Sequence, residues 1–185
     1  KLAESLGHQI IKPIPSLFSF SCKDNNLKEC RGVSVKNVDL KIYLNNKYFK
    51  SQGDLLITHW GFSGPSILRL SSEAARDLYE KKYNFKLSIK WTNLDLHELK
   101  NRMDTLREFN GTSNICNLRP IPSLTKRLWL YLLNKLEIDS TKNWSSLFSK
   151  ERYKIINTLL NDEYQINGKG PFSEEFVTSG GVSLD

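Results

Sequence analysis

The sequence predicts an α+β fold, a β-barrel-like domain interrupted by a small all-α helical domain. Apolar and polar residues alternate with period 2 through 38–44 and 85–91, which is typical of half-buried strands. Apolar residues at helical spacing then fill a long segment before the chain returns to extended structure. We therefore expect a β domain from residues 1–92 plus 162–185, with a helical insert at 93–161.

The chain begins with a short helix and an extended segment. Residues 1–6 have helical character, and Gly7 suits the position just past a helix end. Pro13 and Pro15 lie within 9–20, and prolines this close together exclude a helix. We expect 9–20 to form an edge or crossing strand.

A hairpin follows the first alternating strand. Asn45-Asn46 suits its turn because asparagine tolerates a positive φ angle, and 47–52 would be the return strand. Gly53 is expected to break this strand before a new one at 55–59. Ser63 would then cap a helix that starts at Pro65. Ser71-Ser72 leaves open whether that helix is one element or two.

Three helices are expected in the insert. Asp95 and Glu98 have the spacing of a capping box at the start of the first. Apolar residues at helical spacing place the second at about 123–136. The third begins near Ser149, with Tyr153 on its buried face.

The net charge of +7 gives no clear partner. A basic protein can bind nucleic acid, but no run of lysines and arginines here exceeds two. We interpret the charge as a solvated basic surface and keep a nucleic-acid partner only as the alternative. No apolar run approaches the roughly 20 residues that span a bilayer, so we expect no membrane partner.

Three cysteines, Cys22, Cys30 and Cys116, occur without a CxxC motif. An odd number without metal-binding spacing argues against a disulfide framework and a metal site, and favours a reducing cytoplasm. A pairing of Cys22 with Cys30 is the alternative. The chain starts with Lys1 instead of Met, as a piece of a longer protein would.

The stretch GDLLITHWGFSGPSILRL at 53–70 reads as strand, glycine loop and helix start. This arrangement presents backbone N–H groups and a few polar side chains at a site. His59 would be a proton donor or substrate contact there, or a turn residue that bonds backbone. Thr58 and Ser63 have structural alternatives as a strand-end hydrogen bond and a helix cap.

A second candidate lies near the end of the chain, where Thr178 is followed by Gly180 and Gly181. A strand that ends in a double glycine allows its backbone to approach a ligand closely. Gly168-Lys169-Gly170 starts like a dinucleotide motif, but no βαβ unit surrounds it.

Three stretches together resemble the BaiN-like, YhiN-like family of NAD(P)/FAD-dependent flavoproteins. They are the glycine-loop stretch 53–70, the terminal PFSEEFVTSGGVSLD and the opening LGHQIIKPIPSLFSF. The family pattern Thr-His-x-Gly-x-Ser-Gly-Pro is complete between Thr58 and Pro65, and Val-Thr-x-Gly-Gly-Val is complete at 177–182. Trp60 and Glu175 depart from the usual phenylalanine and alanine.

The resemblance implies that the chain is the middle insert of a flavoprotein. Its partner would be the FAD-binding Rossmann domain of the same full-length chain, with a hydride passing from NAD(P)H to FAD and then to an unknown small-molecule substrate. The insert would cap the flavin and would neither bind FAD nor be active alone. The resemblance also implies that His59 is a catalytic residue. The implied cofactor-binding residues are Thr58, Gly61, Ser63, Gly64, Thr178, Gly180 and Gly181.

Two alternatives to a flavin-capping insert remain. One is a basic nucleic-acid-binding module, and the other is a purely structural insert that only positions domains.

Overall fold

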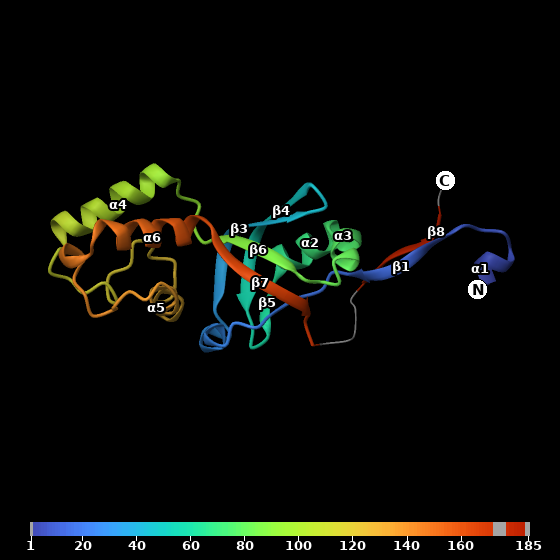
Figure 1. Cartoon of the computed structure of the whole chain (residues 1–185), viewed down its shortest axis with the longest axis horizontal. Helices are drawn as coiled ribbons and strands as arrows, with labels where there is room; N and C mark the ends of the chain where they lie inside the picture. The colour runs from blue at the N-terminus through green and yellow to red at the C-terminus, as the bar shows by residue number, and fades with distance from the viewer. Residues whose placement is uncertain (1, 172–176, 184–185) are drawn as a thin grey trace.

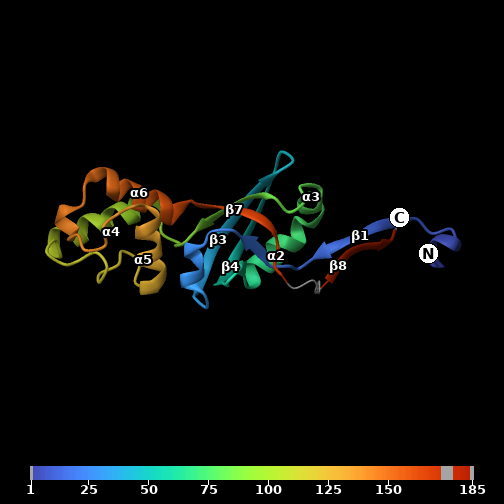
Figure 2. The same cartoon turned by 60° about the horizontal axis from the view of Figure 1, so that its bottom comes forward.

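A closed six-stranded barrel forms the centre of the molecule in the computed structural model, which describes residues 2–171 and 177–183. A helical group lies at one end of the barrel and a two-stranded ribbon at the other (Figures 1 and 2). The barrel order is β2 (Phe20–Cys22), β5 (Gly61–Ser63), β4 (Lys47–Ile57), β3 (Ser34–Leu44), β6 (Phe85–Lys90) and β7 (Asp162–Lys169). The predicted α+β class, a barrel with helices, is confirmed.

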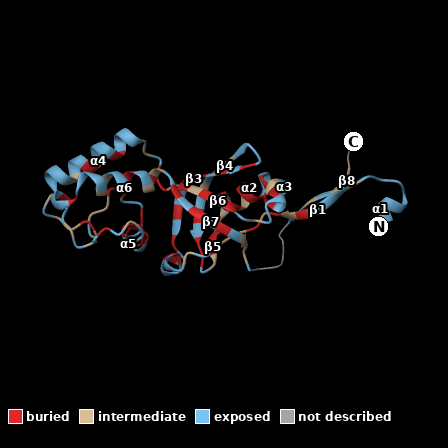
Figure 3. Cartoon of the chain, in the orientation of Figure 1, coloured by how far each residue is buried: buried red, intermediate tan, exposed pale blue. Residues whose placement is uncertain are grey.

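The alternating residues fill the barrel interior. Val38, Leu40 and Ile42 of β3 are buried, while the residues between them face outward. Figure 3 shows buried residues along the barrel strands and on the inner sides of the helices. Asn45 and Asn46 both have positive φ, so the predicted hairpin turn between β3 and β4 is confirmed.

Gly53 does not break its strand, contrary to the prediction. β4 runs without interruption, and Gly53 pairs with Val38 next to a register shift between Val35 and Val38. An irregularity of this kind bends a strand while its pairing continues. β4 is accordingly one strand of the closed barrel.

The helix after the glycine loop is two helices, α2 (Pro65–Glu73) and α3 (Ala75–Glu80). They meet at Ala74, and not at Ser71-Ser72. The Ser71 hydroxyl donates to the Leu68 carbonyl within α2 at 2.8 Å, so this serine stays helical.

The helical group lies between β6 and β7 in the sequence. It contains α4 (Leu96–Phe109), α5 (Lys126–Lys135), the short 3-10 helix η2 (Trp144–Ser146) and α6 (Ser149–Leu160). The capping box of Asp95 and Glu98 is present at the start of α4, as predicted. α5 starts later than predicted because Thr125 accepts a hydrogen bond from the Leu128 amide and caps it there.

Tyr153 of α6 is 59% exposed, so its predicted burial is wrong. The buried face of α6 is formed by Ile155, Ile156 and Leu159. Tyr153 keeps its hydroxyl in solvent, where it needs no protein partner.

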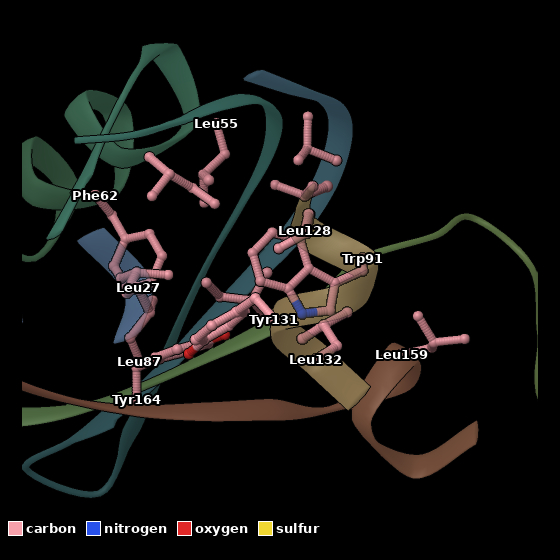
Figure 4. Packing of buried hydrophobic residues seen from close by; sticks show 14 of the residues in the cluster. Leu27, Leu55, Phe62, Leu87, Trp91, Leu128, Tyr131, Leu132, Leu159 and Tyr164 are labelled. Atoms are coloured by element: carbon pink, nitrogen blue, oxygen red, sulfur yellow. The ribbon is translucent and has the colours of Figure 1, made fainter. Parts of the chain in front are cut away.

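One hydrophobic cluster extends from the barrel into the helical group. Figure 4 shows part of this cluster, where α5 packs near Trp91, just beyond the end of β6, and Tyr164 of β7. The α5 residues labelled there are Leu128, Tyr131 and Leu132. The 3-10 helix η1 (Asn26–Cys30) also packs against α5. The two parts therefore share a core, and the boundaries at 92/93 and 161/162 stay a prediction.

A buried carboxylate sits where the two parts meet. Asp162 is 3% exposed and accepts hydrogen bonds from the Lys135 ammonium at 2.5 Å, the Tyr164 hydroxyl at 2.6 Å and the Trp91 indole at 2.9 Å. Burial raises the pKa of Asp162, and the neighbouring Lys135 charge opposes this. A second bond, from the Tyr131 hydroxyl to Asp24 at 2.6 Å, also joins α5 to the barrel side.

The ribbon pairs β1 (Ile10–Ser16) with β8 (Val177–Val182) in antiparallel fashion. The short α1 (Leu2–Ser5) precedes it. Two contacts with α2 hold its base: the Phe18 amide donates to the Ser71 hydroxyl at 2.9 Å, and the Ser16 and Ser72 hydroxyls lie 3.1 Å apart. The base of the ribbon is therefore fixed to the barrel.

Replacing Lys135 with methionine should destabilise the protein by about 2 kcal/mol at neutral pH, because it leaves the Asp162 charge buried without its ion-pair partner. The loss should shrink as pH falls, because protonation removes that charge. The double variant Lys135→Met/Asp162→Asn should recover much of the stability. Urea unfolding at pH 5 and pH 8 compares the two variants with the unsubstituted protein. A Lys135→Met cost that does not change with pH would contradict this role.

Candidate functional site

Thr58 closes the turn that joins β4 to β5. Its amide donates to the Gly61 carbonyl at 2.8 Å, and its hydroxyl accepts from the Gly61 amide at 3.1 Å. The side chain is buried. The strand-end alternative considered for Thr58 accounts for these contacts.

Gly61 and Gly64 allow close approach of the chain to its own backbone. A Cβ at Gly61 would lie 2.3 Å from the Phe20 carbonyl oxygen of β2, and one at Gly64 would lie 2.9 Å from the Asp54 carbonyl oxygen. Gly64, with φ of 100°, is the N-cap of α2, so the expected capping role of Ser63 is wrong. Ser63 instead pairs with Leu56 as the last residue of β5.

His59 is the exposed residue of the turn. Its ring lies edge-on to Trp60, with 4.3 Å between the ring centroids. The Trp60 indole donates to the Ser19 hydroxyl at 3.3 Å, and the Ser19 carbonyl accepts from the Gly170 amide at 2.8 Å. Ser19 follows the ribbon strand β1, so the turn that presents His59 is tied to the segment beside the ribbon.

The two ribbon glycines differ. A Cβ at Gly180 would lie 2.7 Å from the Lys12 carbonyl oxygen, whereas nothing lies within 4 Å of one at Gly181. Gly180 therefore lies close to Lys12 at the register shift of the ribbon, whereas Gly181 pairs with Ile11 and has open space on its Cβ side. Thr178 pairs with Pro15 and is exposed. Glu175 lies outside the described residues.

The two candidate groups lie on different sheets: the turn at 58–61 joins two barrel strands, whereas β8 belongs to the two-stranded ribbon. Within residues 2–171 and 177–183, no hydrogen bond or ion pair joins His59 to β8. Of the predicted site residues, His59, Thr178 and Gly180 are exposed, and Gly181 has open space on its Cβ side. Their roles toward a cofactor or substrate stay predictions.

Sequence reasoning missed the buried group around Asp162. Lys135 and Asp162 are far apart along the chain, and neither lies in a motif. The only local signal is that Asp162 and Tyr164 share a face of an alternating strand.

The described part of the chain contains no group of three or more His, Cys, Asp or Glu side chains placed to hold a metal ion. All three cysteines are free thiols, and burial raises the pKa of Cys30 to about 11. No helix there is long and apolar enough to cross a membrane. The cytoplasmic location stays a prediction.

The dinucleotide-like stretch at 168–170 does not form an FAD pyrophosphate cradle. Gly168 and Lys169 belong to strand β7 and do not open a helix, so they offer no helix N-terminus to a phosphate. Gly61, Gly64 and Gly180 each face backbone of this chain.

Gly61→Ala should destabilise the protein by about 3 kcal/mol or prevent folding, because the added methyl group would overlap the β2 backbone at a positive φ. Gly168→Ala is the control in the same barrel, where nothing lies within 4 Å of the added group. Thermal unfolding compares the two. Equal stability of both variants would contradict the packing role of Gly61.

Two comparisons with known proteins bear on this chain. No curated protein matches it. The family model described as "HI0933-like protein barrel and H2TH domain" matches residues 14–177. That domain is the middle insert of HI0933-like and BaiN-like flavoproteins, an FAD-binding group, so the resemblance seen in the sequence is confirmed. The chain therefore belongs to the HI0933-like family, as its barrel and H2TH domain.

Proposed function

We propose that this chain is the substrate- and flavin-capping insert of an NAD(P)/FAD-dependent oxidoreductase. The observation that carries the proposal is the ribbon. Ile10 pairs with Val182, and the Ser183 amide donates to the Gln9 carbonyl at 2.9 Å. Residues 9–10 and 182–183 therefore lie side by side. An insert must join its host domain at two neighbouring points, and this geometry meets that requirement.

The ribbon also has the surface of a segment that another domain covers. Ile11, Val177 and Val182 are exposed apolar residues on it. An isolated two-stranded ribbon is marginally stable, and its edges carry unpaired backbone groups. The FAD-binding Rossmann domain of the same full-length chain is the partner that we propose for this surface.

His59, Trp60 and the open side of Gly181 would then face the cleft between insert and partner. FAD, held by the Rossmann domain, would supply the hydride chemistry. The insert would shape the substrate cleft and exclude water from it. An exposed imidazole in this cleft can exchange a proton with substrate, which is the role that we propose for His59.

FAD titration of this chain alone should show no tight binding, because the pyrophosphate cradle would lie in the partner domain. Quenching of flavin fluorescence measures it, with the full-length protein as the positive control. Stoichiometric FAD binding by the chain alone would overturn the proposed division of labour.

His59→Ala in the full-length protein should slow substrate turnover by about 100-fold, as loss of a general acid or base does. His97→Ala is the matched control, because His97 is exposed on α4, where its ring nitrogen lies 3.1 Å from the Asn101 side-chain amide. Turnover and flavin reduction by NADH or NADPH are measured for both variants. Unchanged rates in His59→Ala would exclude its catalytic role and favour a purely structural insert.

A further inference from the structure

The fold gathers lysines that are scattered in the sequence onto one outer face of the barrel. This face is formed by the outward side chains of β3, β4 and β6, which lie side by side. Two adjoining hollows on it share Lys41, Ser88 and Asn161. The lysines that line them are Lys41, Lys50, Lys81, Lys86 and Lys90. We call the two hollows together the lysine groove.

The lysine groove is large enough for an extended ligand. Its two hollows have volumes of about 540 and 560 Å³. It runs along the outer face from Leu160 at the end of α6 toward Lys81 just beyond α3. From Asp39 to Tyr43 it follows β3 for about 13 Å, at the usual rise of a strand.

Positive charge exceeds negative charge in the groove. Its two carboxylates, Asp39 and Glu163, are engaged by Lys90 at 3.8 Å and Lys86 at 3.4 Å. Lys41 and Lys50 stand directly opposite each other on neighbouring strands, an arrangement that is destabilising for like charges. Within the described residues, no carboxylate lies within ion-pair distance of either lysine. This pair therefore favours an anionic ligand.

Two exposed aromatic rings stand at the hairpin end of the groove. Tyr43 and Tyr48 are 54% and 60% exposed, and their ring centroids are 4.6 Å apart. The Lys41 ammonium lies 4.3 Å from the centroid of the Tyr48 ring. Flat rings beside cations can stack with bases while the cations contact phosphates.

We propose that the lysine groove binds single-stranded nucleic acid, with phosphates on Lys41 and Lys50 and bases on Tyr43 and Tyr48. An acidic peptide would use the lysines but would leave the two tyrosine rings without stacking partners. The groove uses none of the residues proposed to face the flavin. The inference therefore goes beyond the proposed oxidoreductase role and does not depend on it.

The test is fluorescence anisotropy with labelled single-stranded RNA and DNA of about 12 nucleotides, within the range of known single-strand sites. The purified protein should bind at low salt and weaken steeply as salt rises. The double variant Lys41→Glu/Lys50→Glu should lose at least tenfold in affinity. Lys36→Glu/Lys154→Glu carries the same charge change on exposed residues outside the groove and should lose less than threefold.

Tyrosine variants distinguish nucleic-acid binding from the binding of other polyanions. Tyr48→Ala should weaken binding about fivefold or more, whereas Tyr153→Ala, an exposed tyrosine on α6, should not. Circular dichroism confirms that each variant is folded. No binding at low salt, equal losses in the two lysine double variants, or equally tight groove-dependent binding of polyglutamate would each overturn the proposal. FAD is absent throughout, so these outcomes leave the flavin-capping function untouched.

Discussion

The structure depends on the closure of the barrel at its two shortest strands. β2 and β5 are three residues each, and they meet where Gly61 lies against the backbone of Phe20 and Cys22. A side chain larger than hydrogen would push the strands apart. The turn with His59, the start of α2 and the base of the ribbon all follow from this contact, because each continues from one of these two strands.

Local patterns predicted local structure well. Alternation in β3 and β6 and the capping box at Asp95 act over a few residues, so the sequence displays them directly. The wrong predictions arose where pairing between distant strands overrides the local pattern. Gly53 looks like a strand breaker alone, but its pairing with Val38 carries β4 through it. The gathering of the lysines is likewise invisible in sequence, because it arises from the register between β3, β4 and β6.

The sequence predicted which residues belong to the candidate site, but not how they are arranged in space. The family pattern located the turn at 58–61 and the glycines of β8, yet spacing cannot tell a glycine that faces a ligand from one that faces its own chain. Distances separate Gly61 and Gly180, which face backbone, from Gly181, which has open space on its Cβ side. The arrangement of His59 and β8 around a flavin is a proposal that depends on the proposed partner domain.

The state of the three thiols has a practical consequence. Cys22 and Cys30 are buried, and burial raises the pKa of both, so neither forms much thiolate at neutral pH. Cys116, only half-buried, lies in the helical group between α4 and α5. The native sequence thus provides one preferred position for a maleimide dye without any substitution. A probe there would report motion of the helical group, as energy transfer to a second label on the barrel.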